Sequence, residues 1–147
     1  AEGDQNRTRE HLEVVRRNAN QLLQIVNDVL DLSKIEAEKL QIDHEVFDLR
    51  ELLQDLRALM ALKAEDKGLN FQVEFSESLP EHIYSDPLRM KQILINLIGN
   101  AIKFTSSGSV ILKVQCNEIF NKNCKLQFDI VDTGPGVTDE LRESLFQ

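Results

Sequence analysis

The sequence predicts an α+β protein, in which helices are segregated from a largely antiparallel sheet and one long helix comes first. Three observations support this fold class. Apolar residues recur at helical spacing in several stretches, they alternate with polar residues in others, and a polar segment joins the last two alternating stretches as in a hairpin. Hydrophobic residues make up 41% of the 147 positions, which is enough for a real core.

The first predicted element is a helix over residues 8–40. Leu23 and Leu30 widen its apolar stripe to the face used in helical bundles. The a and d heptad positions hold Leu12, Val15, Ala19, Leu22, Val26 and Val29. A helix that exposed such a stripe would not be stable alone, so we expect it to pack against other helices. The pattern leaves open whether those helices belong to a second copy or to the same chain.

The next helix should begin after Asp48. Asp48 and Glu51 fit a capping box, and Phe47 and Leu52 are placed as a hydrophobic staple. We expect this helix to stop before Gly68, because glycine suits the position that follows a helix end.

Strands are predicted where apolar and polar residues alternate. The expected strands cover residues 70–75, 82–85, 109–116 and 124–131. The last two should form a hairpin around residues 117–123. A short final helix is predicted over residues 138–146, because acidic residues in its first turn favour a helix start.

The helix predicted over residues 86–105 carries the most information. Asp86 is a good N-cap and Pro87 fits the first helical position. At about 100° per residue, its main polar side chains fall within an arc of roughly 80°. These side chains are Arg89, Gln92, Asn96, Asn100 and Lys103. Apolar residues cover most of the remaining circumference, so we expect a mostly buried helix with one polar stripe.

This polar stripe suits a site for a polar, anionic ligand. Asn is a weak helix former, so two copies at Asn96 and Asn100 need a reason. The alternative is an amphipathic helix whose narrow polar side faces water, although such sides are usually built from Lys and Glu. The residue types favour the ligand site and leave the alternative open.

A second candidate segment lies at the end of the last predicted strand. Asp132 ends that strand, and Gly134 and Gly136 follow it. Glycines let the backbone approach a flat ligand closely, and the carboxylate can accept a hydrogen bond from an exocyclic amine. Taken alone, the pattern is also compatible with a turn capped by an acid.

Together these segments resemble sensor histidine kinases. Residues 96–105, Asn-Leu-Ile-Gly-Asn-Ala-Ile-Lys-Phe-Thr, resemble the N box of that family, and residues 132–136, Asp-Thr-Gly-Pro-Gly, look like its G1 box. Residues 31–40, Asp-Leu-Ser-Lys-Ile-Glu-Ala-Glu-Lys-Leu, resemble the end of the second dimerisation helix. The order and spacing of the motifs also fit, and the resemblance covers nearly the whole chain.

The resemblance implies a domain organisation. Residues 1–45 would be the second helix of the dimerisation and histidine phosphotransfer bundle, and residues 46–147 an incomplete ATP-binding catalytic domain. That domain would be a two-layer α/β sandwich of the Bergerat or GHKL type. It would be truncated at its C-terminus, because residues 143–147 look like the start of the family's F box and the nucleotide lid does not follow.

The phosphoacceptor histidine of the family is not expected in this chain. His11, His44 and His82 lack the His-Glu-x-x-Thr-Pro context in which the family places that residue, and a solvated side chain explains each of them better. Because this histidine and the lid are missing, we expect the chain as given to be inactive and to bind ATP weakly or not at all.

For the nucleotide site, the resemblance implies roles for individual residues. Asn100 would be the Mg²⁺ ligand, since an amide oxygen is a hard donor suited to that ion. Lys103 would neutralise ATP phosphate as a point charge. Asp132 would accept the adenine amine, Phe104 would be a nearby wall, and the two glycines of the G1 box would let the loop turn beside the nucleotide.

Asn96 decides the expected chemistry. Gyrase-type and chaperone-type ATPases carry Glu at the matching place, where a carboxylate can activate water, whereas Asn is no base at neutral pH. The resemblance therefore implies a protein histidine kinase, which passes the γ-phosphate of ATP to a histidine and then to a response-regulator aspartate. The rival functions are a GHKL ATPase-type conformational clamp and a non-catalytic dimerisation or partner-binding module.

Composition limits the partners. A net charge of −8 and a pI of about 4.9 argue against nucleic-acid binding. No apolar run suits a membrane span or signal peptide, so we expect a cytoplasmic segment without membrane contact; an anchor elsewhere in the parent protein stays open. Cys116 and Cys124 are expected to be reduced thiols. By resemblance, the partners would be a second copy, through the 8–40 helix, and the receiver domain of a response regulator.

Overall fold

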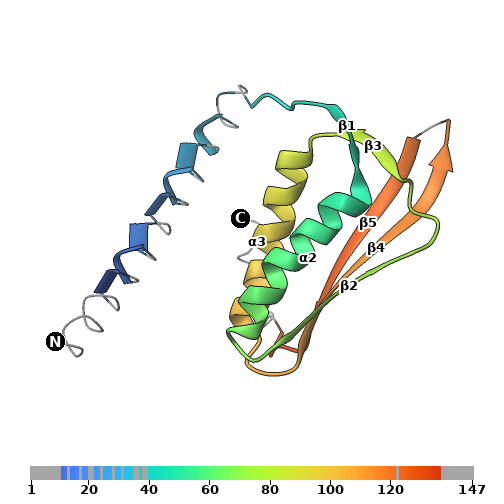
Figure 1. Ribbon diagram of the computed structural model, residues 1–147. Helices are drawn as coiled ribbons and strands as arrows, with labels where there is room; N and C mark the ends of the chain where they lie inside the picture. Colours follow the sequence, from blue (N-terminus) through green and yellow to red (C-terminus); the bar gives the residue numbers. More distant parts are fainter. Residues whose placement is uncertain are drawn as a thin grey trace. The chain divides into compact units, whose positions relative to one another are not determined.

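The computed structural model describes most of the chain after residue 39 and part of the preceding helix (Figure 1). The described residues are 11–12, 14–16, 18–19, 22–23, 25–27, 29–30, 32–34, 37, 40–121 and 123–136. The chain divides into two compact units, Ala1–Ile42 and Asp43–Gln147. Thr8, the predicted start of the first helix, and the final helix predicted over residues 138–146 lie outside the described residues. No helix within the described residues combines the length and apolarity needed to cross a lipid bilayer.

The first unit contains the long amphipathic helix. Its described residues between 11 and 34 are helical and exposed. Leu12 and Leu22, both at heptad positions, are each 63% exposed, so the apolar stripe is available for packing against other helices. Leu40, the predicted last residue of the helix, has no regular secondary structure. The next heptad position of the apolar stripe is Ser33, which is polar. Beyond it there is less apolar surface whose burial would stabilise the helix.

The second unit consists of two layers (Figure 1). Its elements in chain order are β1 (Glu45–Asp48), α2 (Leu49–Glu65), β2 (Asn70–Phe75), β3 (His82–Ser85), α3 (Pro87–Phe104), β4 (Ser109–Phe120) and β5 (Asn123–Asp132). The two helices lie side by side and form a layer against a three-stranded sheet of order β2-β4-β5. A separate two-stranded sheet pairs β1 with β3. This arrangement confirms the predicted α+β class and the two-layer sandwich, although the sequence did not predict β1.

The strand pairing differs from the sequence prediction in two respects. β2 and β4 are parallel, because β3 and α3 form the crossover between them. β4 and β5 form the predicted antiparallel hairpin, but the prediction that residues 117–123 form its connecting loop was wrong. A β-bulge between Cys116 and Glu118 absorbs one residue, and pairing then continues to Phe120 opposite Asn123.

The core lies between the helix layer and the sheet. Every second residue of β4 and one stripe of each helix point into it, as the strand and helix periods require. Its fully buried side chains include Leu49, Leu53, Leu56, Met60, Ile98, Val110, Leu112 and Val114. α3 is therefore anchored to the sheet through its middle, which places its C-terminal half beside the end of β5.

The structure confirms the predicted N-cap of α2 and the predicted end of the helix before Gly68. The Asp48 Oδ1 atom accepts hydrogen bonds from the backbone N–H groups of Arg50 (2.8 Å) and Glu51 (3.0 Å), as an N-cap does. Gly68 follows the helix with a φ of 68°, a left-handed conformation that glycine adopts without steric cost.

α3 is less buried than predicted. Its buried residues are Leu94, Ile98 and Ile102, whereas Leu88 and Ile93 are 71% and 59% exposed. The helix packs on α2, β4 and β5 through a single face, so apolar side chains outside that face remain accessible among the described residues. The expectation of a mostly buried helix was therefore wrong, because an apolar residue type does not specify which neighbour covers it.

Candidate functional site

The polar side chains predicted to bind a ligand lie in the second half of α3. Asn96, Asn100 and Lys103 are all exposed, and their spacing places them on one side of the helix. At 1.5 Å per residue, Asn96 lies about 10 Å from Lys103 along the helix axis. Phe104, the predicted wall, is 62% exposed, and the Lys103 Nζ atom lies 5.2 Å from the centroid of its ring.

The loop after β5 packs against the end of α3. A Cβ atom built on Gly134 would lie 2.6 Å from Asp132 Oδ1, 3.3 Å from Thr105 Oγ1 and 3.5 Å from the Phe104 carbonyl oxygen. The missing side chain of Gly134 therefore allows the loop and the helix end to approach closely. This contact brings Asp132 to the same end of α3 as Lys103, although the two residues come from different layers of the fold.

The Asp132 carboxylate is oriented by its own loop. Its Oδ1 atom accepts a hydrogen bond of 2.8 Å from the backbone N–H of Gly134, as in an Asx turn. The side chain is exposed, so the second carboxylate oxygen can accept a hydrogen bond from an external donor. Gly136 lies further along the loop, with a φ of 76° that suits glycine.

Thr133, which sequence reasoning did not single out, ties this loop to the turn after α3. Its Oγ1 atom donates to the Ser107 carbonyl oxygen (2.8 Å) and accepts from the Ser109 N–H (3.2 Å). Its backbone N–H also donates to the Ser109 carbonyl oxygen (3.2 Å). The position of Thr133 between Asp132 and Gly134 was the one available signal, but its partners become neighbours only in the folded sheet.

Lys67 is the second residue that sequence reasoning missed. It lies in the turn after α2, yet its Nζ atom donates hydrogen bonds to carbonyl groups at the C-terminal end of α3. No local pattern could reveal this contact, because the partners are 35 to 38 positions away in the sequence.

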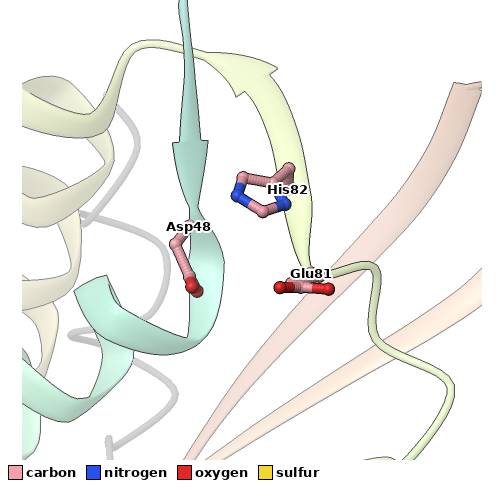
Figure 2. Close-up of side chains that lie close together, drawn as sticks. All are labelled: Asp48, Glu81 and His82. Atoms are coloured by element: carbon pink, nitrogen blue, oxygen red, sulfur yellow. The ribbon is translucent and has the colours of Figure 1, made fainter.

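Asp48, Glu81 and His82 form a cluster at the β1–β3 sheet (Figure 2). One potential ligand atom from each lies within 4.8 Å of the others. The fold explains this proximity without a cation. Asp48 and His82 are register partners in the two strands, the Asp48 carboxylate caps α2, and the Glu81 carbonyl oxygen accepts a hydrogen bond from the Leu49 N–H. His82, like His11 and His44, is exposed, as the sequence predicts.

The cavities described for the second unit lie away from the predicted site. The larger, of about 550 Å³, is lined by Val46, Pro80, His82, Ile83, Tyr84, Ser85, Met90, Ile119, Asn123, Cys124, Leu126 and Phe128. A smaller one, of about 230 Å³, lies beside the end of β2 and the middle of β4. Burial raises the pKa of the Cys124 thiol, and the neighbouring Cys116 raises it further, so Cys124 stays protonated and weakly nucleophilic at neutral pH. The residues predicted to bind a ligand line neither of these two cavities.

Two protein families match the chain. HisKA, the His Kinase A (phospho-acceptor) domain, matches residues 1–38. HATPase_c, the Histidine kinase-, DNA gyrase B-, and HSP90-like ATPase family, matches residues 85–147 and therefore includes α3 and the loop after β5.

Similar proteins are signalling kinases. The signal transduction histidine-protein kinase BarA of Escherichia coli (strain K12) is 41% identical over 139 residues, which cover 95% of this chain and 15% of BarA. The sensor histidine kinase GacS of Pseudomonas protegens is 40% identical over 138 residues, covering 94% of this chain and 15% of GacS. The crystal structure of full-length ShkA in complex with AMPPNP matches with a TM-score of 0.77 and 33% identity, over 95% of this chain and 29% of ShkA. The chain thus spans less than one third of each of these three proteins.

Proposed function

Because this chain belongs to the sensor histidine kinases, we propose that the protein carrying it is a protein histidine kinase. It transfers the γ-phosphate of ATP to a histidine, for relay to an aspartate of a response regulator. Residues 1–45 supply the second helix of the dimerisation and phosphotransfer bundle, and residues 46–147 belong to the ATP-binding catalytic domain. The observation that supports the proposal is the packing of the Asp132 loop against the end of α3, next to Phe104 and Thr105.

The residues at this end of α3 fit a nucleotide chemically. The accessible oxygen of Asp132 would accept the adenine amine, a donor that guanine lacks at that position. The exposed ammonium of Lys103 would hold phosphate oxygens; its contact with the Phe104 ring is worth about 0.5–1 kcal/mol at an exposed site, which phosphate can outweigh. Gly134 and Gly136 keep the loop backbone close to the ligand.

Asn100 would hold the Mg²⁺ ion that accompanies ATP. Its side chain is exposed one turn before Lys103, and an amide oxygen is a donor that suits this hard cation. A bound Mg²⁺ ion would offset the negative charge of the phosphates. Asn96, one further turn away, offers no carboxylate to activate water, so the site favours phosphoryl transfer over rapid hydrolysis.

The exposed apolar stripe of the first unit supports dimerisation. Described heptad residues such as Leu12, Leu22 and Val29 are more than half exposed, and burial of this stripe in a bundle with a second copy removes it from water. The bundle would present the phosphoacceptor histidine, and a response-regulator receiver domain would be the next acceptor of the phosphoryl group.

The proposal is tested in the full-length protein by replacing Asn100 with Ala. The variant should lose Mg²⁺-dependent binding of AMPPNP in calorimetric titrations and should no longer form acid-labile phosphohistidine from labelled ATP. Unchanged binding would refute the role of Asn100. Rapid ATP turnover by the unmodified protein without a phosphorylated protein intermediate would refute the kinase itself and favour the conformational clamp.

A further inference from the structure

The C-terminal end of α3 is capped by a lysine from another element. The Lys67 Nζ atom donates hydrogen bonds to the carbonyl oxygens of Ile102 (2.8 Å), Lys103 (2.8 Å) and Thr105 (3.1 Å). Lys67 comes from the turn that joins α2 to β2. An ammonium group has three N–H donors, and all three are matched here by carbonyl acceptors.

These carbonyl groups would otherwise lack partners within the helix. The last turn of a helix leaves its C=O groups without intrahelical donors, and the helix dipole adds partial negative charge at the same end. The Ala101 carbonyl is satisfied locally, because it accepts from both the backbone N–H (3.0 Å) and the hydroxyl (2.8 Å) of Thr105. Lys67 donates to the carbonyl groups of Ile102, Lys103 and Thr105, which the local cap leaves without a donor. Its positive charge also lies at the helix end where the dipole is negative.

The turn after α3 is held from two sides. On the α2–β2 side, the Asn70 N–H donates to the Gly108 carbonyl (3.1 Å), close to the contacts of Lys67. On the other side, Thr133 holds Ser107 and Ser109, as described above. This turn therefore connects the end of α3, which carries Lys103, to the Asp132 loop and fixes their relative position.

We propose that Lys67 is a positioning residue of the nucleotide site. Its ammonium group locks the last turn of α3, so that Lys103 keeps a fixed place relative to the Asp132 carboxylate. This role rests on the proposed function. Lys67 acts through Lys103 and contacts the backbone of α3 rather than the nucleotide.

The first test measures the helix end without ligand. In Lys67→Met, amide hydrogen exchange at Lys103 and Thr105 should be faster than in the unmodified chain, because the last turn loses its cap. Lys63→Met is the matched control, since Lys63 is an exposed lysine in the last turn of α2; it should leave these rates unchanged. Unchanged exchange in Lys67→Met, in a variant with a native circular dichroism spectrum, would overturn the proposal.

The second test measures binding of Mg-AMPPNP by the full-length protein. Lys67→Met should weaken binding about tenfold, the lower end of the effect known for residues that orient metal ligands. Lys67→Arg, which retains the charge and several donors, should recover part of this loss, and Lys63→Met should bind normally. Faster exchange combined with unchanged affinity would make Lys67 a helix cap only and would overturn the positioning role.

A double-mutant cycle decides whether Lys67 acts through Lys103. In a Lys103→Ala background, Lys67→Met should cause no further loss of affinity, because the group that it positions is gone. A full additional loss would mean that the Lys67 charge attracts the phosphates directly, which contradicts the proposal. If the unmodified protein fails to bind Mg-AMPPNP, both the proposed function and the positioning role are wrong. If it binds normally but the losses of affinity from Lys67→Met and Lys103→Ala add, only the positioning role is wrong.

Discussion

The two ends of α3 are held in different ways. At the N-terminal end, Asp86 Oδ1 accepts from the Arg89 N–H (2.9 Å), and its Oδ2 accepts from the Asp43 N–H (3.0 Å). At the C-terminal end, Lys67 holds three carbonyl groups from a position 35 or more residues away. Each end thus has a local cap, Asp86 or Thr105, but distant residues add one hydrogen bond at the first end and three at the second. The end that carries the candidate site is therefore the one with more hydrogen bonds from distant parts of the chain.

The largest expected effect comes from the middle of α3, which both ends depend on. Ile98 is fully buried, so Ile98→Ala should lower the free energy of unfolding by about 2–5 kcal/mol. The adjacent Leu97 is 51% exposed, and Leu97→Ala should cost about 0.5 kcal/mol or less. Urea denaturation of both variants gives the comparison. Equal losses would mean that the outward face of α3 is covered as well as the inward face.

The next effect is specific to the C-terminal end. Gly134→Ala would place a methyl group 2.6 Å from Asp132 Oδ1, and the carboxylate must move away. We expect Mg-AMPPNP binding by the full-length protein to weaken about tenfold, a change of about 1.4 kcal/mol, with little change in the free energy of unfolding. Gly99→Ala is the control for stability, because its Cβ would meet no atom within 4 Å. Unchanged affinity in Gly134→Ala would remove Asp132 from the site.

Substitutions of Asp86 at the N-terminal end of α3 should change the stability of the protein and the dependence of that stability on pH. Asp86→Ala should lower the Tm by roughly 5 °C, because the helix loses its N-cap. Asp86→Asn keeps one oxygen to cap the Arg89 N–H, and it removes the charge and the second oxygen, which accepts from the Asp43 N–H. The hydrogen bond from the Arg89 N–H, with smaller contributions from Asp43 and the Arg89 charge, holds the pKa of the Asp86 carboxyl below its ordinary value of 3.8, against the opposing effect of burial.

The direction of this pKa shift sets the pH window. A carboxyl group whose pKa is lower in the folded state stabilises the fold above its unfolded pKa, and this contribution disappears as the pH falls through the folded pKa. The stability difference between the unmodified chain and Asp86→Asn should therefore be full at pH 5 to 7, begin to fall near pH 3.8, and vanish once the pH is below the lowered pKa of the folded state. Thermal unfolding at several pH values measures it. A difference that persists at the acid end would show that the charge is not responsible.

The smallest effect is expected for an ion pair in the first half of α3. Lys91 Nζ lies 3.6 Å from Asp55 Oδ2 on α2, with side chains 36% and 66% exposed. Solvent screens such a pair, so Lys91→Met should change the free energy of unfolding by about 0.5 kcal/mol or less. A loss well above about 1 kcal/mol in urea denaturation would mean that this pair, rather than the buried face, holds the two helices together.

Part of the candidate site could be predicted because its signals are local. The N-cap at Asp86 and the positions of Asn96, Asn100 and Lys103 on one side of α3 follow from the period of a helix. The position of Asp132 at the end of a strand follows from the alternation before it. The approach of the Asp132 loop to the last turn of α3 was expected from the resemblance, and the contacts of Gly134 are what this structure adds to it.

By itself the sequence determined most of the elements, the caps of α2 and α3 and the residue types that a nucleotide would meet, because each of these depends on neighbours within about one helical turn. Only the tertiary structure decided the parallel pairing of β2 with β4, the exposed apolar faces of α3, and the contacts of Lys67 and Thr133 with the turn after α3. These features join segments that are distant along the chain. A hydrogen bond between such segments leaves no periodic trace in the sequence, since any lysine in a turn has the same local pattern whether or not a helix end lies beside it.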